Sequence, residues 1–320
     1  MPRAFVTGIS GQDGSYLSEQ LLAQGWDLHA LVREASRSDE QPVGDQVVQH
    51  VGDLTDFVGV TRILDEVEPD VVFNLGGISS VATSWDEPAA TGEISGVAVV
   101  ALLDASLRLQ ERRGSEVRFV QASSSEIFGD AEVAPQSELT PLRPISPYGL
   151  AKAYAHQAVG IYRAKGLFAT SCILYNHESP RRPRSFVTRK ITAGAAEIVA
   201  GKSDRLMLGN LDVKRDWGWA PDYVDALTRA AAAPEPADYV IATGVAHSVR
   251  EFVAAAFNAV GIPDWESYVG TDARFVRPAD AHEMRGDSSK ALSVLGWSPT
   301  VDFTEVVALM TRHDLGLLAP

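Results

Sequence analysis

The segment Ala4-Phe-Val-Thr-Gly-Ile-Ser-Gly-Gln-Asp-Gly14 places three glycines directly after a short apolar run. The apolar run is typical of a buried strand, and the residues after Gly14 have the spacing of an amphipathic helix. Because glycine has no Cβ atom, the backbone can turn tightly here and approach a pyrophosphate, which the start of the helix stabilises. The strand, turn and helix together predict a dinucleotide-binding loop.

Beyond this loop, apolar strands alternate with helical segments through the first half of the chain. Strands are expected at 4–7, 28–32, 47–51, 71–74 and 117–121, with helices near 57–67 and 92–110. This alternation predicts an α/β fold, a doubly wound parallel Rossmann sheet with a smaller α/β C-terminal substrate domain. We expect the first domain at 1–175 and the second at 176–320, with segments near 210–245 returning to the first.

Tyr148-Gly-Leu-Ala-Lys152 carries the first catalytic candidates. A tyrosine and a lysine four residues apart lie on the same face of a helix. A nearby ammonium favours the phenolate over the phenol, so we expect Tyr148 to act as a base on a sugar hydroxyl, assisted by Lys152.

Ser123-Ser-Ser-Glu126 follows the strand expected at 117–121. Ligands of open α/β sheets bind at the carboxyl ends of strands, and residues two apart in an extended segment point the same way. Ser124 and Glu126 are therefore expected to face one site, although a serine-rich turn with a solvated Glu126 is the simpler alternative. A second proton-transfer group would distinguish elimination from plain redox chemistry.

The cofactor is less sharply defined by the residues. An acid at the end of the second strand bonds a ribose hydroxyl, whereas an arginine there holds a 2′-phosphate. The chain has Arg33 followed by Glu34, so NADP is expected and NAD is the alternative. Asp53 and Leu54 are candidates for the adenine, and Asp53 could equally well be a helix N-cap.

Composition excludes several classes of partner. The chain has 320 residues and a formal charge of −14, which argues against binding to nucleic acid or to a membrane surface. No apolar run long enough to span a bilayer is expected, and no metal site. The single Cys172 lies in an apolar run, so a buried structural thiol and a cytoplasmic location are expected.

One region has the opposite charge. Five cations lie between Arg181 and Lys190, which suits a diphosphate or, as the plainer alternative, a solvated face.

These segments resemble the GDP-mannose 4,6-dehydratase family of extended short-chain dehydrogenases/reductases over nearly the whole chain. The most specific are Asn176-His-Glu-Ser-Pro-Arg-Arg182 and Leu208-Gly-Asn-Leu-Asp-Val-Lys-Arg-Asp-Trp217, with Phe186-Val-Thr-Arg-Lys-Ile191 and Arg277-Pro278. The resemblance implies a lyase that converts GDP-mannose to GDP-4-keto-6-deoxymannose with internally recycled NADP. A nucleotide-sugar 4-epimerase or 4-reductase and a non-catalytic NADP-binding regulator are the alternatives.

The resemblance also implies the residues of the site. It carries over the catalytic residues Ser124, Glu126, Tyr148 and Lys152. It carries over cofactor contacts to Gly8, Ile9, Ser10, Gly11, Gln12, Asp13, Gly14, Arg33, Asp53, Leu54, Leu75, Gly76, Gly77, Tyr148, Lys152, His177 and Arg182. It carries over substrate contacts to Ser84, Ser124, Glu126, Asn176, Val187, Lys190, Arg215 and Arg277.

Some positions depart from the family's pattern. Glu34 stands where a second arginine is usual, which leaves the choice of NADP open, and Ala90 stands where a tyrosine is common. The stretch from Glu34 to Gln49 is shorter than the loop that helps the family form tetramers. A homodimer is therefore expected as well as a homotetramer.

Overall fold

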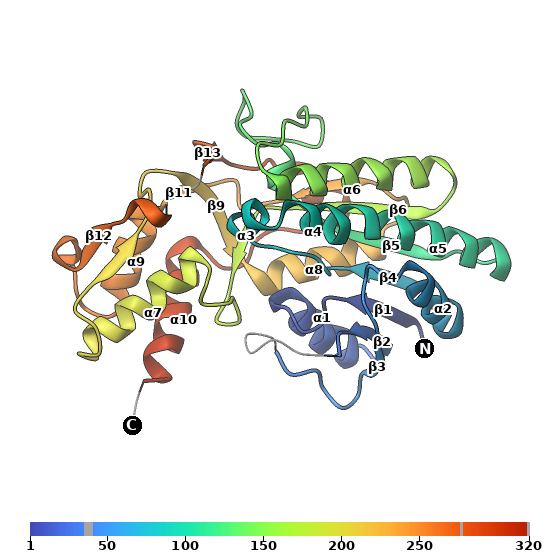
Figure 1. The fold of residues 1–320 in the computed structure, drawn as a ribbon, viewed down its shortest axis with the longest axis horizontal. Helices are drawn as coiled ribbons and strands as arrows, with labels where there is room; N and C mark the ends of the chain where they lie inside the picture. Colours follow the sequence, from blue (N-terminus) through green and yellow to red (C-terminus); the bar gives the residue numbers. More distant parts are fainter. Residues whose placement is uncertain (35–40, 276–277, 319–320) are drawn as a thin grey trace.

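A seven-stranded parallel sheet forms the centre of the protein, with the strand order β10-β6-β5-β4-β1-β2-β3 (Figure 1). The computed structural model describes residues 1–34, 41–275 and 278–318. The strands of this sheet are β1 (Arg3–Thr7), β2 (Asp27–Val32), β3 (Val48–Val51), β4 (Val71–Asn74), β5 (Arg118–Ser124), β6 (Phe168–Leu174) and β10 (Asp238–Ile241). The predicted doubly wound α/β fold is confirmed.

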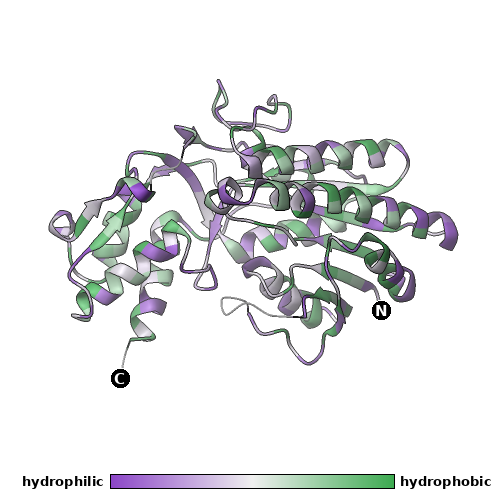
Figure 2. Cartoon of the chain, in the orientation of Figure 1, coloured by the Kyte–Doolittle hydropathy of each residue, from purple (hydrophilic) through white to green (hydrophobic). Residues whose placement is uncertain are grey.

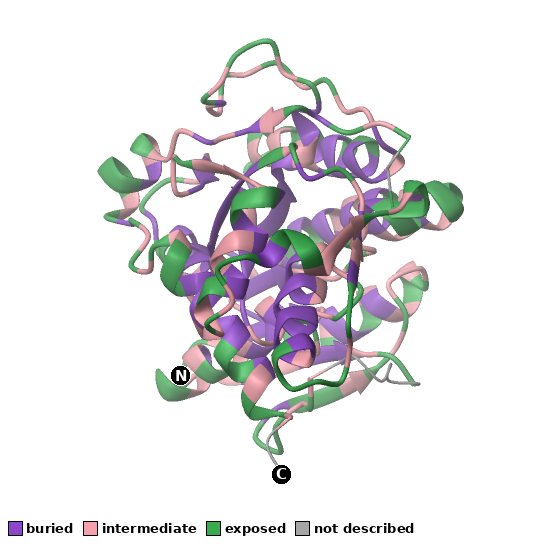
Figure 3. Cartoon of the chain, turned by 90° about the vertical axis from the view of Figure 1, so that its left-hand side faces the viewer, coloured by how far each residue is buried: buried purple, intermediate pink, exposed green. Residues whose placement is uncertain are grey.

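Helices cover both faces of this sheet. Ala4 and Val6 of β1 belong to the core that contains residues of α1 (Gln12–Ala23) and α8 (Ala220–Ala231). Phe5, between them, belongs to the core on the other face, whose helices are α2 (Phe57–Val67), α5 (Ala98–Arg113) and α6 (Pro147–Ala164). Successive strand side chains point to opposite faces, so strands covered on both sides must be apolar throughout. Figure 3 shows this buried interior.

The run from Pro88 to Arg113 is long and apolar enough to cross a membrane. It comprises α4 (Pro88–Gly92), the π-helical turn η1 (Glu93–Val97) and α5. The expectation that no segment has this character is therefore wrong, but 56% of the apolar window is buried inside the protein. Packing in the core accounts for its composition, and Figure 2 shows its hydrophobic body with a hydrophilic C-terminal end.

The second half of the chain builds a smaller α/β region with its own core. Its strands are β7 (Asn176–Glu178), β8 (Leu206–Leu208), β9 (Lys214–Trp219), β11 (Ala246–Ser248), β12 (Val269–Thr271) and β13 (Glu283–Met284). Its larger helices are α7 (Val187–Val199), α9 (Val249–Ala259) and α10 (Phe303–Gly316), with short helical turns η3 (Trp265–Tyr268) and η4 (Ala273–Phe275). The turn η5 (Ala291–Leu295) packs instead on α8 and on β10 of the large sheet. Between β9 and β11 the chain returns to the large sheet through α8 and β10.

The first turn of α1 packs so closely on the glycine loop that it leaves no space for a side chain at Gly14. A Cβ atom there would lie 2.2 Å from the carbonyl oxygen of Gly8 and 2.5 Å from the Cα of Ile9. Both neighbours are backbone atoms and cannot rotate away. Gly14 therefore sets how closely the helix approaches the loop.

We expect Gly14→Ala to lower the free energy of unfolding by about 1–3 kcal/mol, because the added methyl group forces the loop and helix apart. Gly160→Ala is the matched control, since a Cβ atom at this helical position meets nothing within 4 Å. It should instead stabilise the protein by about 0.5–1 kcal/mol. Urea unfolding of the two variants measures both changes, and equal behaviour would contradict the packing argument.

Candidate functional site

Helix α6 carries the Tyr-Lys pair at the carboxyl end of the large sheet. Its N-cap is Ser146, whose side chain accepts a hydrogen bond from the N–H of Gly149 at 3.0 Å. Tyr148 and Lys152 are both buried on the first turns of this helix. The Nζ of Lys152 donates to the carbonyl oxygen of Ala122 at 2.8 Å and lies 5.8 Å from the centre of the Tyr148 ring. The ammonium is thus anchored to the end of β5, beside the phenol.

Ser84 supports the helix that carries this tyrosine. Its side chain is completely buried in α3 (Val81–Asp86), where its hydroxyl donates to the carbonyl oxygen of Val81 at 2.7 Å. The same hydroxyl accepts a hydrogen bond from the backbone N–H of Tyr148 at 3.2 Å. In this structure Ser84 therefore holds the start of α6, and its predicted contact with substrate stays a prediction.

The strand that precedes the acidic candidate runs past the expected 117–121 but ends before Glu126. β5 ends at Ser124, and Ser125–Ile127 form the short 3-10 helix η2. The argument from an extended segment is therefore wrong for Glu126, because alternation of side chains stops at Ser124. The hydroxyl of Ser124 accepts from the N–H of Glu126 at 3.2 Å, and the carboxylate of Glu126 acts electrostatically on Tyr148. A tight turn, rather than an extended strand, brings the acid and the phenol together.

Burial controls the proton affinity of Tyr148. It raises the pKa of the phenol to about 12, although a hydrogen bond with the Ser124 side chain acts in the opposite direction. The charge of Glu126 raises this pKa further, and the guanidinium of Arg182 lowers it. Burial therefore favours the phenol over the phenolate, and the predicted assistance of Lys152 to the phenolate stays a prediction. The sequence did not indicate that Arg182 would lower the pKa of Tyr148.

The glycine loop has the form that a dinucleotide requires. Gly8 has a φ angle of 73°, in the left-handed region, and the N-cap residue Gly11 makes no side-chain hydrogen bond to the start of α1. Gly76, after β4, donates its N–H to the hydroxyl of Thr7 at 3.0 Å, and a Cβ atom at this glycine would meet Leu54 at 2.8 Å. The ends of β1 and β4 thus meet around a helix start whose N-cap residue has no side chain. These residues fit a pyrophosphate.

Arg33 and Glu34 are exposed directly after β2. The pKa of Asp53 is lowered, mainly because the backbone and side chain of Thr55 donate hydrogen bonds to its carboxylate. The charge of Arg33 lowers this pKa further. The alternative that Asp53 caps a helix is wrong, because the N-cap of α2 is Asp56. Arg33 and Asp53 therefore lie on one edge of the loop region, as a cofactor ribose would need.

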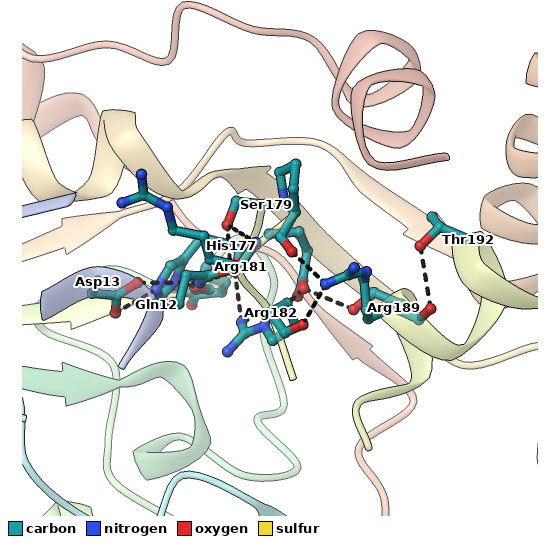
Figure 4. Close-up of polar contacts among 12 residues, drawn as sticks. Gln12, Asp13, His177, Ser179, Arg181, Arg182, Arg189 and Thr192 are labelled. Atoms are coloured by element: carbon teal, nitrogen blue, oxygen red, sulfur yellow. Dashed lines mark hydrogen bonds and ion pairs between the residues drawn. The ribbon is translucent and has the colours of Figure 1, made fainter. Parts of the chain in front are cut away.

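Two segments far apart in sequence meet beside this loop (Figure 4). The Nε2 of Gln12 donates to the carbonyl oxygen of His177 at 3.1 Å, and its Oε1 accepts from the hydroxyl of Ser179 at 2.8 Å. Asp13 pairs with the His177 ring at 2.9 Å. The guanidinium of Arg182 donates to the same His177 carbonyl at 2.6 Å. The structure thus brings the predicted cofactor residues of α1 and of the segment after β6 into one polar network.

Comparison with known proteins places this site in a family. A sequence profile described as GDP-mannose 4,6 dehydratase matches residues 5–310. The chain belongs to the GDP-mannose 4,6-dehydratase family. It is 43% identical to GDP-mannose 4,6 dehydratase 2 of Arabidopsis thaliana over 98% of its own length and 87% of the relative's. It is 41% identical to the Homo sapiens GDP-mannose 4,6 dehydratase over 98% of its own length and 92% of the relative's.

Solved structures share the same fold. The UDP-glucose 4-epimerase of Thermotoga maritima, with UDP-glucose, superposes with a TM-score of 0.87 at 24% identity, over 99% of this chain and all of the other. The Thermus thermophilus UDP-glucose 4-epimerase in complex with NAD has a TM-score of 0.83 at 28% identity, over 98% of this chain and 99% of the other. The first likeness shows the fold alone.

Within the GDP-mannose 4,6-dehydratase family fold, the basic run from Arg181 to Lys190 is not a free cationic surface. Four of its cations form ion pairs inside the protein: Arg181 with Glu19, Arg182 with Glu178, Arg184 with Glu197, and Arg189 with Asp314. The ammonium of Lys190 lies 3.3 Å from the centre of the Phe275 ring. Much of the positive charge of the run is therefore compensated within the protein, and its contact with a diphosphate stays a prediction.

Arg189 was not singled out from the sequence, yet it organises this segment. It binds both oxygens of Asp314, on α10, through its Nε, and it donates to the carbonyl oxygens of Pro180 and Arg182. Arg189 and Asp314 are both buried. The last helix thus holds the loop that carries Arg182.

The remaining substrate candidates lie in the smaller region. Asn176 is half-buried at the start of β7, and Val187 begins α7. Arg215, on β9, is 5% exposed and donates to Asp280 and to the carbonyl oxygen of Ala281. Arg277 lies outside the described residues. Their roles toward a substrate stay predictions that the family implies.

The environment of Lys152 predicts an unusual dependence of stability on pH. Burial lowers the pKa of this lysine to about 8, whereas an unfolded lysine titrates near 10.5. Below pH 8 the folded protein therefore holds an unfavourable buried charge, and this penalty shrinks as pH rises from 8 to 10.5. We expect Lys152→Met to unfold at higher urea concentration than the unmodified protein at pH 7. The difference should shrink at pH 10, and a constant difference would contradict the burial argument.

Proposed function

We propose that this chain converts GDP-mannose to GDP-4-keto-6-deoxymannose, with Ser124, Glu126, Tyr148 and Lys152 as its catalytic residues. The observation that carries the proposal is the approach of two different proton-transfer groups. The Glu126 carboxylate raises the pKa of the Tyr148 phenol, so both act in one electrostatic environment. A reaction that only moves a hydride needs the tyrosine and lysine but no second base.

The proposed sequence begins when Tyr148 takes the proton of the C4 hydroxyl. Oxidation at C4 makes the neighbouring C5–H acidic, and Glu126 removes that proton. The hydroxyl at C6 then leaves as water, with a proton from Glu126 or through Ser124. Reduction at C6 is completed by a proton at C5, which balances the proton that Tyr148 took from the C4 hydroxyl. Lys152 keeps a positive charge near the phenol of Tyr148, and Arg182 lowers the pKa of this phenol.

Residues at the ends of four strands would hold the cofactor. The backbone from Gly8 to Gly14 would bind the pyrophosphate, and Arg33 and Asp53 lie where the adenosine ribose is expected. Gly76, after β4, contacts Thr7 at the start of the glycine loop. When bound, an oxidised dinucleotide supplies the acceptor for the C4 hydride, returns it to C6 and adds a positive charge to the site. The exposed guanidinium of Arg33 supports NADP over NAD.

The oligomer we propose uses the outer face of α6 and its neighbour. Leu150, Tyr154 and Ile161 follow one another along one side of α6 and are 64%, 53% and 62% exposed. Val97, on the adjoining turn, is 44% exposed. Exposed apolar side chains that gather in this way are typical of a protein interface, so we propose a homodimer through this face, and pairing of two such dimers would give a homotetramer.

We place the enzyme in the cytoplasm, consistent with its buried free Cys172.

The carboxylate of Glu126 provides the decisive test. We expect Glu126→Gln to lower the formation of the 4-keto product by about 10²–10⁴-fold, because the variant lacks the base for C5. Oxidation at C4, followed as a change in the absorbance of the bound cofactor, should partly survive. Tyr148→Phe is the control and should lose both steps.

An ultraviolet assay of the enolisable ketone across GDP-, UDP-, dTDP- and CDP-hexoses measures this loss and the choice of nucleotide together. Near-normal turnover by Glu126→Gln would remove the dehydratase proposal and favour an epimerase or reductase.

Arg33 predicts the preference between cofactors. We expect Arg33→Ala to weaken NADP binding by about 10–100-fold, because a charge-assisted contact to the 2′-phosphate is lost, while NAD binding changes little. Glu34→Ala is the matched control one residue along, and it should strengthen NADP binding by removing a like charge. Titration of cofactor-depleted protein with each dinucleotide measures the ratio. An unchanged ratio in Arg33→Ala would show that another residue makes the choice.

A further inference from the structure

His177 lies between two groups that can only accept hydrogen bonds. Its Nδ1 is 2.7 Å from the carbonyl oxygen of Tyr175, and its Nε2 is 2.9 Å from Oδ2 of Asp13. The ring is buried and stacks on Tyr223 at a centroid distance of 4.5 Å and an interplanar angle of 22°. Stacking on Tyr223 and a hydrogen bond at each ring nitrogen therefore fix the position of the His177 ring.

The chemistry of the two partners decides which atoms carry the protons. A carbonyl oxygen has no proton to donate, and neither has an ionised carboxylate. Burial alone would raise the pKa of Asp13, but the charge and hydrogen bond of His177 and the charge of Arg182 lower it to about 2. Two of the favourable influences on the carboxylate do not depend on His177, since Oδ1 of Asp13 accepts from the Gln12 amide at 3.1 Å and the charge of Arg182 favours the ionised form. We therefore take Asp13 as ionised at neutral pH. Both bonds are made only when the imidazole carries an N–H on each nitrogen.

We propose that His177 is held as an imidazolium, and that its ion pair with Asp13 makes it a positioning residue that fixes the glycine loop against the segment carrying Arg182. The proposal deepens the proposed function, because it concerns how the cofactor site of that enzyme is assembled.

The charges around the ring agree with this assignment. The groups that contact the ring or act on its carboxylate partner are Asp13 from α1, Arg182 from the segment after β6, Lys152 from α6 and the neutral phenol of Tyr223. Arg182 is itself paired with Glu178. The positive charge of Arg182 lowers the pKa of Asp13 and so favours the carboxylate that the assignment requires. Buried charges are tolerated when they are paired in this way.

The Asp13–His177 ion pair lies at the first turn of α1, directly after the glycine loop. The Oδ1 atom of Asp13 accepts from the amide of Gln12 at 3.1 Å, while Oδ2 holds His177. The amide of Gln12 bridges onward to Ser179. Gln12 and Asp13 occupy the first turn of α1, whose N–H groups would receive the pyrophosphate. Loss of the pair therefore weakens the attachment of the helix start to the segment that carries Arg182, although the Gln12 hydrogen bonds and the Arg181–Glu19 ion pair still join them.

His156 provides an internal comparison. It lies on α6, where its Nδ1 is 2.9 Å from the hydroxyl of Ser171 and its Nε2 is 3.8 Å from Asp238. A hydroxyl can donate as well as accept, so this geometry does not require two ring protons. Burial lowers the pKa of His156, which favours its neutral form. The two histidines should therefore differ in the same spectrum.

The direct test is ¹⁵N NMR of the full chain labelled at its histidine rings, with Leu replacements of His177 and His156 to assign the signals. At pH 7 we expect two protonated nitrogens for His177, and one protonated and one bare nitrogen for His156. In Asp13→Asn the new amide can donate to Nε2, so one nitrogen of His177 should become bare while the contact remains. A bare nitrogen on His177 in the unmodified protein at pH 7 would overturn the proposal.

Cofactor binding tests the positioning role independently of turnover. Asp13→Ala and His177→Leu should each raise the Kd for NADP by about 10–100-fold, the range for losing a hydrogen bond to a charged group. The double variant should be no weaker than either single one, because each removes the same link. His156→Leu should stay within about twofold of the unmodified protein.

These outcomes separate the two proposals. Should Glu126→Gln retain turnover while Asp13→Ala, His177→Leu and their double variant weaken NADP binding equally, the reaction is misassigned and the positioning role of His177 stands. If Asp13→Ala and His177→Leu bind NADP as tightly as the unmodified protein, His177 has no positioning role, whatever reaction the enzyme performs.

Discussion

Burial of ionisable side chains at the carboxyl edge of the parallel sheet is the constraint on which this structure depends. A charge removed from water is costly unless another group compensates it. Three pairs provide this compensation: Asp13 with His177 and Arg189 with Asp314, which are far apart in sequence, and Glu178 with Arg182 within one segment. Because the first two of these pairs each join two elements, the need to compensate charge also fixes the relative positions of the first helix, the segment after β6 and the last helix.

The same burial sets the proton chemistry. It raises the pKa of Tyr148 and lowers that of Lys152, so both groups are pushed toward their neutral forms. A phenol in this state becomes a base only when positive charge is brought to it. Arg182 contributes part of that charge from outside the Tyr-Lys motif. Tyr148 is thus tuned by a residue that also takes part in the network around the glycine loop, which links cofactor site and catalytic site.

Much of the fold followed from local patterns. The glycine loop, the strands from β1 to β5 and the helix α2 are readable in sequence, since short apolar runs separated by helical periods are typical of a parallel α/β sheet. Tyr148 and Lys152 were identifiable because they lie within one helix. The turn after Ser124 was not, because it is capped by the Ser124 hydroxyl, which accepts from the N–H of Glu126 and leaves no signal in apolar spacing.

The amino-acid sequence alone determined the doubly wound sheet, the loop for a dinucleotide and the residue types available for proton transfer, because these depend on neighbours within about one element. Only the tertiary structure decided which charges are free and which are paired. The cations between Arg181 and Lys190 look like a polyanion site in sequence, yet four of them face carboxylates in ion pairs within the protein. Such pairings depend on packing between elements up to 125 residues apart, as for Arg189 and Asp314, and no local pattern specifies them.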